Sequence, residues 1–273
     1  MTIIAHISDT HFGAEVDSVV EALRHTLDNI KPEITILSGD ITQRALPSEF
    51  EAAKKFFDSL AGNIKIAIPG NHDIPLYNIF TRFLMPYNNY NQAFSKRETV
   101  WKNDNLVIVA LDATSPYRHT NGKLNEDYIR RHLDGVKAAS GSDVILMVVA
   151  HQPLLTALPE DRNEVLINTE VTASIFEDYE VDIVLSGHVH FPLFATTEGH
   201  FAEIGRNFII AGAGTAVSRR TRSGAPNSFN IIDMKNRHLL EITKYELSSN
   251  TGEFVPHLPT SFGYNNERGW LKI

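Results

Sequence analysis

Short apolar runs, separated by stretches with helical periodicity, constrain most strongly what this chain can fold into. The runs are rich in Ile, Val and Leu, and they are continuous rather than alternating, which is typical of strands covered on both faces. Such strands require helices on either side of a sheet. The runs occupy positions 3–7, 34–37, 64–68, 106–111, 144–150, 183–185 and 208–211.

Helical patterns lie between these runs. An apolar stripe over 19–30 ends before Pro32, which cannot continue a helix. Ser48 and Glu51 have the spacing of a capping box and predict the start of a second helix. Asn125 is a residue type that caps a third helix. The alternation of strands and helices predicts an α/β layered fold.

The chain shows no internal repeat and no linker, so we expect one domain over 1–273. Residues 74–100 are polar and aromatic with weak periodicity, and we expect them to form a lid over a site, the contact of a homodimer, or a surface loop. The C-terminal tail, 245–273, has little pattern, and its aromatic residues are expected to pack on the body of the domain.

The composition limits the classes of function. The formal net charge is −8, which argues against a partner made of long nucleic acid. There is no cysteine, so disulfides, thiolate metal sites and cysteine nucleophiles are excluded. No apolar segment approaches the roughly 18–20 residues that a membrane span needs, and the N-terminus lacks the pattern of a secretion signal. We therefore expect a cytoplasmic protein without a membrane partner.

Polar motifs follow five of the apolar runs. In open α/β sheets, functional side chains gather at the carboxyl ends of the strands, so these motifs are expected to meet at one edge. Glycines before several of them allow the backbone to turn sharply. The motifs are Asp9-Thr10-His11, Gly39-Asp40, Gly70-Asn71-His72-Asp73, His151 and Gly187-His188-Val189-His190.

The residue types in these motifs are those that bind metal ions. Two carboxylates, four histidines and one amide suit Mn, Fe or Zn better than Ca or Mg. Seven protein ligands are too many for one such ion with an open position, but they suffice for two ions that share a carboxylate. Two metal ions side by side are typical of enzymes that displace a group at phosphorus. The predicted metal ligands are Asp9, His11, Asp40, Asn71, His151, His188 and His190.

Taken together, the five motifs resemble those of the calcineurin-like metallophosphoesterases, over residues 9–190. Within that superfamily, the run 39–44 and Asp73 are most similar to the bacterial class III cyclic-nucleotide phosphodiesterases and the related glycerophosphodiesterases. The resemblance implies a sandwich of two mixed β-sheets flanked by helices, with a binuclear metal centre at one edge.

The resemblance also implies a role for each matching residue. One metal ion would take Asp9, His11 and His190, the other would take Asn71, His151 and His188, and Asp40 would bridge them. A hydroxide between the metals would be the nucleophile. His72 would be the catalytic residue beside the metals, and Asn71 and His72 would bind the substrate. Asp73 would either orient a histidine or serve as a turn carboxylate.

Departures from related families narrow the assignment. Purple acid phosphatases have a tyrosine ligand where this chain has Gln43, and Ser/Thr protein phosphatases have a glycine where it has Ala45. The leading hypothesis is therefore a phosphodiesterase for a small phosphodiester, such as a cyclic nucleotide like cAMP or a glycerophosphodiester. A phosphomonoesterase, a nuclease and a catalytically silent binding module are the alternatives. The sequence does not decide whether four further residues lie near the substrate: Arg219, Arg220, Arg222 and His200.

Overall fold

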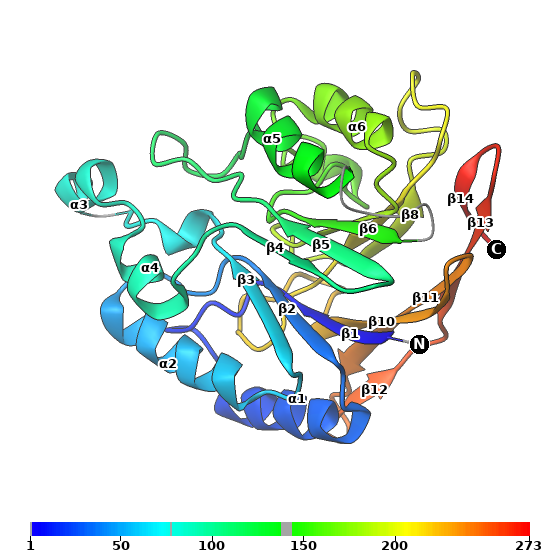
Figure 1. Cartoon of the computed structure of the whole chain (residues 1–273). Coiled ribbons are helices and arrows are strands. Elements are labelled where there is room, and N and C mark those ends of the chain that lie inside the picture. Colours follow the sequence, from blue (N-terminus) through cyan, green and yellow to red (C-terminus); the bar gives the residue numbers. More distant parts are fainter. Residues whose placement is uncertain (1, 77, 138–143) are drawn as a thin grey trace.

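Two mixed β-sheets pack face to face in the computed structural model, which describes residues 2–76, 78–137 and 144–273 (Figure 1). The first sheet contains eight strands: β14 (Gly269–Lys272), β13 (Thr260–Asn265), β11 (Leu239–Leu247), β10 (Ser228–Asn236), β1 (Thr2–Ile7), β2 (Ile34–Ser38) and β3 (Ile64–Ile68) in this order, with β12 (Phe254–Pro256) paired to β11. The second contains six: β4 (Thr99–Lys102), β5 (Leu106–Ala110), β6 (Ile145–Val149), β7 (Ile183–Ser186), β9 (Ile209–Gly212) and β8 (Leu193–Thr196). The predicted fold class is confirmed.

Each sheet has a parallel part that carries the polar motifs. Strands β1, β2 and β3 run parallel, and so do β5, β6, β7 and β9. Every apolar run found in the sequence forms one of these strands. The flanking strands β10, β4 and β8 are antiparallel to their neighbours. The strands that deliver the motifs therefore point the same way within each sheet.

The continuous hydrophobicity of the strands is explained by burial on both faces. One face of each sheet meets the other sheet in a shared core that includes Ile36 and Ile108. The outer face of the first sheet, with Leu37, packs against α1 (Asp17–Ile30) and α2 (Pro47–Ser59). The outer face of the second, with Val109, packs against α5 (Glu126–Lys137) and α6 (Thr169–Asp178). In Figure 1 the two sheets lie between these helix layers.

The helix starts differ partly from the sequence prediction. Asn125 caps α5 as expected, accepting from the Asp127 N–H at 3.0 Å. The prediction that Ser48 and Glu51 form the capping box of α2 is wrong. The helix begins at Pro47, and the side chain that accepts from the N–H of Leu46, at 3.1 Å, is that of Glu49. Proline fits the first helical turn since its missing N–H would be unsatisfied there.

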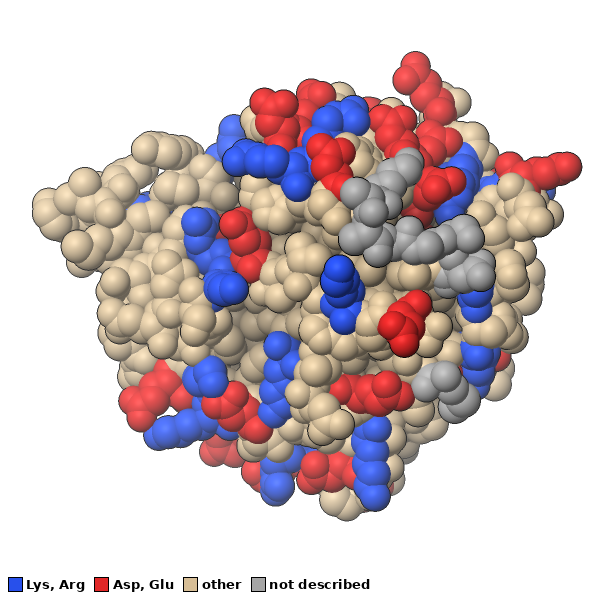
Figure 2. Space-filling model, in the orientation of Figure 1, with Lys and Arg blue, Asp and Glu red and all other residues tan. Residues whose placement is uncertain are grey.

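The segment 74–100 forms two short helices with different surroundings, position 77 lying outside the described residues. Helix α4 (Asn88–Phe94) packs against α2, and its buried Tyr90 donates to the Ala67 carbonyl at 3.0 Å. Helix α3 (Ile79–Leu84) projects from the body at the left of Figure 1. It exposes Phe80 at 74%, and Figure 2 shows little charge on this projection. Elsewhere on that face both signs of charge are interspersed.

The C-terminal third contains regular structure that the sequence pattern did not predict. Strands β10 to β14 extend the first sheet beyond β1. Trp270 on β14 is fully buried and donates from Nε1 to Asp182 Oδ1 at 2.8 Å, which ties the last strand to the start of β7. None of the described helices is long and apolar enough to cross a membrane.

One buried histidine makes the stability of this fold depend on pH. Burial lowers the pKa of His6 on β1 to about 3, whereas an unfolded chain binds the proton near pH 6.5. The stabilisation is therefore complete above pH 6.5 and is lost as the pH falls from there toward 3. Its Nε2 lies 2.9 Å from Ser38 Oγ, so glutamine can keep that contact without titrating.

We predict that His6→Gln removes part of this pH dependence. Between pH 7.5 and 5.5 the wild-type free energy of unfolding should fall by about 1 kcal/mol more than that of the variant. Urea unfolding of chelated protein at both pH values measures the difference. His25→Gln, at an exposed position on α1, is the control and should behave as wild type. Equal pH dependence of the His6→Gln variant and wild type would contradict the prediction.

Candidate metal centre

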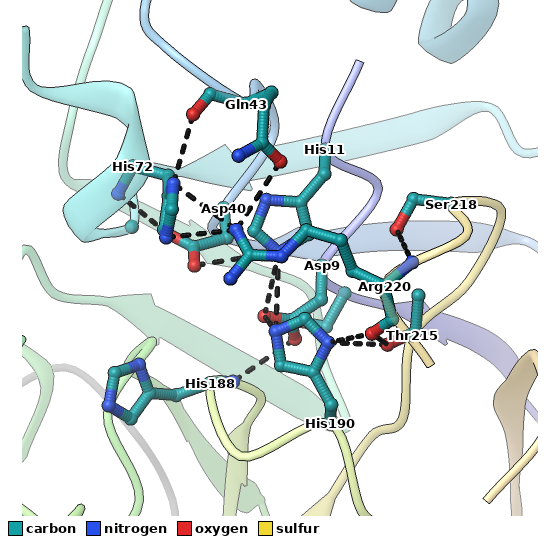
Figure 3. A network of polar contacts seen from close by, with 12 residues as sticks. Asp9, His11, Asp40, Gln43, His72, His188, His190, Thr215, Ser218 and Arg220 are labelled. Atoms are coloured by element: carbon teal, nitrogen blue, oxygen red, sulfur yellow. Dashed lines mark hydrogen bonds and ion pairs between the residues drawn. The ribbon is translucent and has the colours of Figure 1, made fainter. Parts of the chain in front are cut away.

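The seven predicted ligands converge where the carboxyl ends of the parallel strands of the two sheets meet. Figure 3 labels Asp9, His11, Asp40, His188 and His190 among them. The first sheet supplies them from the loops after β1, β2 and β3, and the second from the loops after β6 and β7. No single strand or sheet could supply this cluster, because the two halves of the site come from different layers. The site is therefore a product of the sandwich.

The first group of ligand atoms lies around Asp9, His11, Asp40 and His190. The Nε2 atoms of His11 and His190 are 3.2 Å apart. His190 Nε2 lies 3.4 Å from Asp9 Oδ1, and His11 Nε2 lies 3.7 Å from Asp40 Oδ2. Ligand atoms roughly 2 Å from a common metal ion have such separations.

The second group shares Asp40 with the first. His151 and His188 complete it, and His151 Nε2 lies 3.3 Å from Asp40 Oδ1. Asn71 lines the same pocket, and its Oδ1 is buried without a hydrogen-bond partner. The two groups thus have the composition that the sequence predicted for two metal ions with a shared Asp40.

Three of the histidines are fixed by acceptors that face their other ring nitrogen. His151 Nδ1 donates to the Ser38 carbonyl at 2.7 Å, and His190 Nδ1 donates to the Arg220 carbonyl at 2.7 Å. His188 Nε2 lies 3.3 Å from Glu164 Oε2. Each ring therefore turns its other nitrogen toward the cluster, an arrangement typical of metal-binding histidines. The sequence did not indicate Glu164 or Ser38, since only the fold brings them near.

The cluster fits cations, because several of its buried polar atoms lack partners. Within the described parts of the chain, Asp9 Oδ1, His151 Nε2 and His188 Nδ1 have no hydrogen-bond partner, although each is nearly inaccessible to solvent. Buried polar groups are otherwise almost always paired. Metal ions held by these donors would satisfy the lone pairs that face one another. Metal binding by these residues, and the identity of the metal, stay predictions.

Electrostatics in the cluster also favour added positive charge. Burial opposes the ionisation of Asp40, yet His151 and His72 hold its pKa well below the ordinary value. Burial opposes the charging of His151, yet the Asp40 carboxylate raises its pKa to about 9. Burial lowers the pKa of His11 well below its usual range, which keeps that ring neutral. Either a proton on His151 or a metal ion beside Asp40 would compensate the negative charge of this buried carboxylate.

The backbone at the ligands is mostly left-handed. Positive φ angles occur at Asp9 (53°), His11 (43°), Asp40 (47°), His188 (74°) and His190 (57°). Such angles are uncommon for residues other than glycine and cost of order 1 kcal/mol or more each. They persist where surrounding contacts impose them, and they cluster at functional sites.

Two glycines allow elements to approach the site closely. A Cβ at Gly70 would lie 2.2 Å from both the backbone N and Oδ1 of Asp40, and 2.8 Å from His151 Nε2. A Cβ at Gly187 would lie 2.4 Å from Asp9 Oδ2. At Gly70 the φ of −105° suits any residue, so the requirement there is space alone. The conformational role that the sequence suggested for this glycine is therefore wrong.

Asp73 supports the site through the backbone. Its carboxylate accepts from the N–H groups of Gly70 at 2.8 Å, Ile41 at 3.0 Å and Thr42 at 2.8 Å. Burial and the nearby Asp40 charge raise the pKa of Asp73 to about 6 against these donors. Its hydrogen bonds join the loops after β2 and β3, and none of them goes to a histidine. Of the two roles considered, the contacts are those of a turn carboxylate.

His72 lies at the mouth of the cluster beside Arg220. Both line a pocket of about 460 Å³ together with Asp40, Asn71 and His188. Of the other residues left open by the sequence, Arg222 also lines the pocket, whereas Arg219 and His200 are exposed and do not. The sequence suggested a basic loop here but could not show which of its arginines turns inward.

The space at Gly70 makes a direct test. We predict that Gly70→Ala pushes Asp40 and His151 apart and weakens metal binding by roughly 10–100-fold, the usual effect of displacing supporting contacts. Metal titration by calorimetry, with circular dichroism to verify folding, measures this. Gly135→Ala on α5 is the control, since among the described residues no heavy atom apart from its chain neighbours and the backbone of its own helix lies within 4 Å of its Cβ position. This variant should bind metal as wild type does. Unchanged metal affinity of Gly70→Ala would count against the assigned cluster.

Comparison with known proteins agrees with this geometry. The family model of calcineurin-like phosphoesterases matches residues 2–192, well over half of the chain. A probable cyclic nucleotide phosphodiesterase of Synechococcus sp. is 29% identical over 201 residues, covering 68% of this chain and 72% of that protein. The glycerophosphodiester phosphodiesterase GpdQ of Enterobacter lignolyticus is 32% identical over 87 residues, covering 26% of this chain and 29% of its own length.

Solved structures share the fold at low sequence identity. The purple acid phosphatase PPD1 from yellow lupin matches 95% of this chain with a TM-score of 0.66 and 11% identity, and this chain spans 53% of its length. A dimetal phosphatase from Danio rerio matches 93% of this chain and 98% of its own with a TM-score of 0.61 and 12% identity. With the family match over residues 2–192, this chain belongs to the calcineurin-like phosphoesterases and is a hydrolase of phosphoric esters.

Proposed function

We propose that this protein is a binuclear metal-dependent phosphodiesterase that hydrolyses a small phosphodiester, such as a cyclic nucleotide or a glycerophosphodiester. The observation that carries the proposal is the pair of ligand groups sharing Asp40 at the base of one open pocket. The names of the two relatives, one a probable cyclic nucleotide phosphodiesterase and one a glycerophosphodiester phosphodiesterase, support the diester as the substrate class.

The pocket supports a small substrate. Its volume of about 460 Å³ lies toward the lower end of the range for small-molecule sites, about 300–1,000 Å³. An ion pair between Arg222 and Asp161 joins two loops that line it. The net charge of −8 gives no general attraction for a long nucleic acid. A compact anion drawn to the bound metal ions fits these limits.

Asp9, His11, Asp40 and His190 would hold one metal ion, and Asp40, Asn71, His151 and His188 the other. Bound ions of this kind supply Lewis acidity and an activated water for attack at phosphorus. The protein keeps the ligands in place through the acceptors behind His151, His188 and His190. Asn71 and His72 line the pocket. Asn71 would contact the phosphate directly, whereas the part that His72 would take follows from its contact with Arg220. Mn, Fe and Zn remain the proposed ions, because the donor set mixes carboxylate with imidazole.

The substrate class has a direct test. We predict that chelated protein refilled with Mn hydrolyses bis(p-nitrophenyl) phosphate faster than p-nitrophenyl phosphate, and that chelation abolishes both activities. The release of nitrophenolate, followed by absorbance, measures the two rates. A preference for the monoester would move the function to a phosphatase on the same metal centre. That outcome would sink the diesterase proposal while leaving the metal assignment in place.

Asp40 tests the binuclear arrangement. We predict that Asp40→Ala lowers metal content at both sites and abolishes hydrolysis, because this carboxylate is common to both ligand groups. Elemental analysis of the purified variant measures the metal content independently of activity. Asp28→Ala, at an exposed position on α1, controls for the loss of one carboxylate and should keep both metals. Retention of two metal ions by Asp40→Ala would refute a bridging role.

A further inference from the structure

We propose that Arg220 binds the phosphate group of the substrate, and that His72 and Gln43 hold its guanidinium in position for this role. The inference rests on the proposed function and adds to it a specific anion-binding residue outside the motifs. Arg220 belongs to the loop between β9 and β10, far along the chain from His72, and Figure 3 shows the two side chains meeting at the site.

The backbone of Arg220 is fixed by the metal centre itself. Its carbonyl oxygen accepts from His190 Nδ1 at 2.7 Å and from Thr215 Oγ1 at 3.0 Å. The loop is further anchored by Asn227, whose Nδ2 donates to the Ser218 carbonyl at 2.8 Å. The main chain of Arg220 thus orients His190, a predicted metal ligand. The same contacts fix the position from which the Arg220 side chain extends toward the cluster.

The side chain of Arg220 reaches His72 and Gln43. Its Nη1 donates to His72 Nε2 at 3.0 Å and to Gln43 Oε1 at 3.3 Å. His72 Nδ1 faces the Gln43 carbonyl at 3.0 Å, so that nitrogen carries the hydrogen. His72 Nε2 then presents a lone pair, and it accepts from Arg220 rather than donating into the pocket. In this arrangement the cationic donor that faces the pocket is the guanidinium of Arg220.

Arg220 has no direct carboxylate partner in the described part of the chain. Among the residues that the structure describes, no carboxylate forms an ion pair with it. Arg222 on the same loop differs, since Asp161 pairs with it and the Val189 carbonyl accepts from it at 3.1 Å. Arg220 is half-buried and lines the pocket with Asp40 and Asn71. A fixed guanidinium without a carboxylate partner is suited to a phosphate oxygen, which it can contact through two N–H groups.

The experiment compares Arg220→Gln, Arg220→Lys and Arg219→Gln, all loaded with Mn. Glutamine removes the charge and the terminal N–H groups of the guanidinium, whereas lysine keeps the charge. Arg219→Gln removes one positive charge at the adjacent exposed position and is the matched control. Binding of inorganic phosphate is measured by calorimetry, and hydrolysis of bis(p-nitrophenyl) phosphate gives KM and kcat.

We expect Arg220→Gln to bind phosphate roughly 10–100-fold more weakly with metal content unchanged, as expected for losing one charge-assisted contact. Its KM should rise, Arg220→Lys should recover part of the affinity, and Arg219→Gln should match wild type. Phosphate affinity of Arg220→Gln equal to wild type would overturn the proposal and leave Arg220 a support for His72. Loss of metal from this variant would also overturn it, since Arg220 would then act through His190.

The same experiment separates this inference from the proposed function. If the wild type does not hydrolyse the diester, the phosphodiesterase proposal fails. Weaker phosphate binding by Arg220→Gln would still support the role of Arg220 as an anion-binding residue. If the wild type hydrolyses the diester and Arg220→Gln binds phosphate as wild type does, the proposed function stands and the inference on Arg220 fails. The two failures are therefore distinguishable.

Discussion

The site depends on compensating the negative charge of two buried carboxylates, Asp9 and Asp40. Both are almost fully removed from water, and imidazole nitrogens face them at 3.3–3.8 Å. A buried carboxylate is costly unless a positive charge or several hydrogen-bond donors compensate it. Here some donors are present, such as the His188 N–H to Asp9 Oδ2 at 3.0 Å, but other lone pairs remain. The arrangement is therefore one that cations complete.

Holding these groups together requires a rigid frame, and the sandwich supplies it. The parallel strands of the two sheets end at a common edge, so loops from both layers reach one another over a short distance. Asp73 joins two of the loops, and the Ser38 carbonyl orients a histidine that comes from the other sheet. The left-handed backbone at five ligand positions is tolerated because each loop begins at the end of a buried strand, where surrounding contacts hold the backbone.

The outer part of the site depends on a different kind of contact. Arg220, Arg222, Asp161 and Glu164 come from two long loops, and ion pairs and single hydrogen bonds place them. These residues form the part of the pocket wall that lies beside the predicted metal ligands. The cluster of predicted metal ligands and the pocket wall meet at Arg220, whose carbonyl contacts His190 and whose guanidinium contacts His72.

The sequence by itself determined the central strands, the main helices and the five motifs, because continuous apolar runs and helical stripes are local signals. It missed the capping role of Glu49 and the strands after β9, since a half-buried strand such as β11 resembles ordinary surface sequence. Only the tertiary structure decided that Glu164 stands behind His188, that Gly70 is needed for space, and that Arg220 rather than Arg219 turns inward. These features depend on distances between residues far apart in the chain, and such distances are fixed only when the two sheets pack.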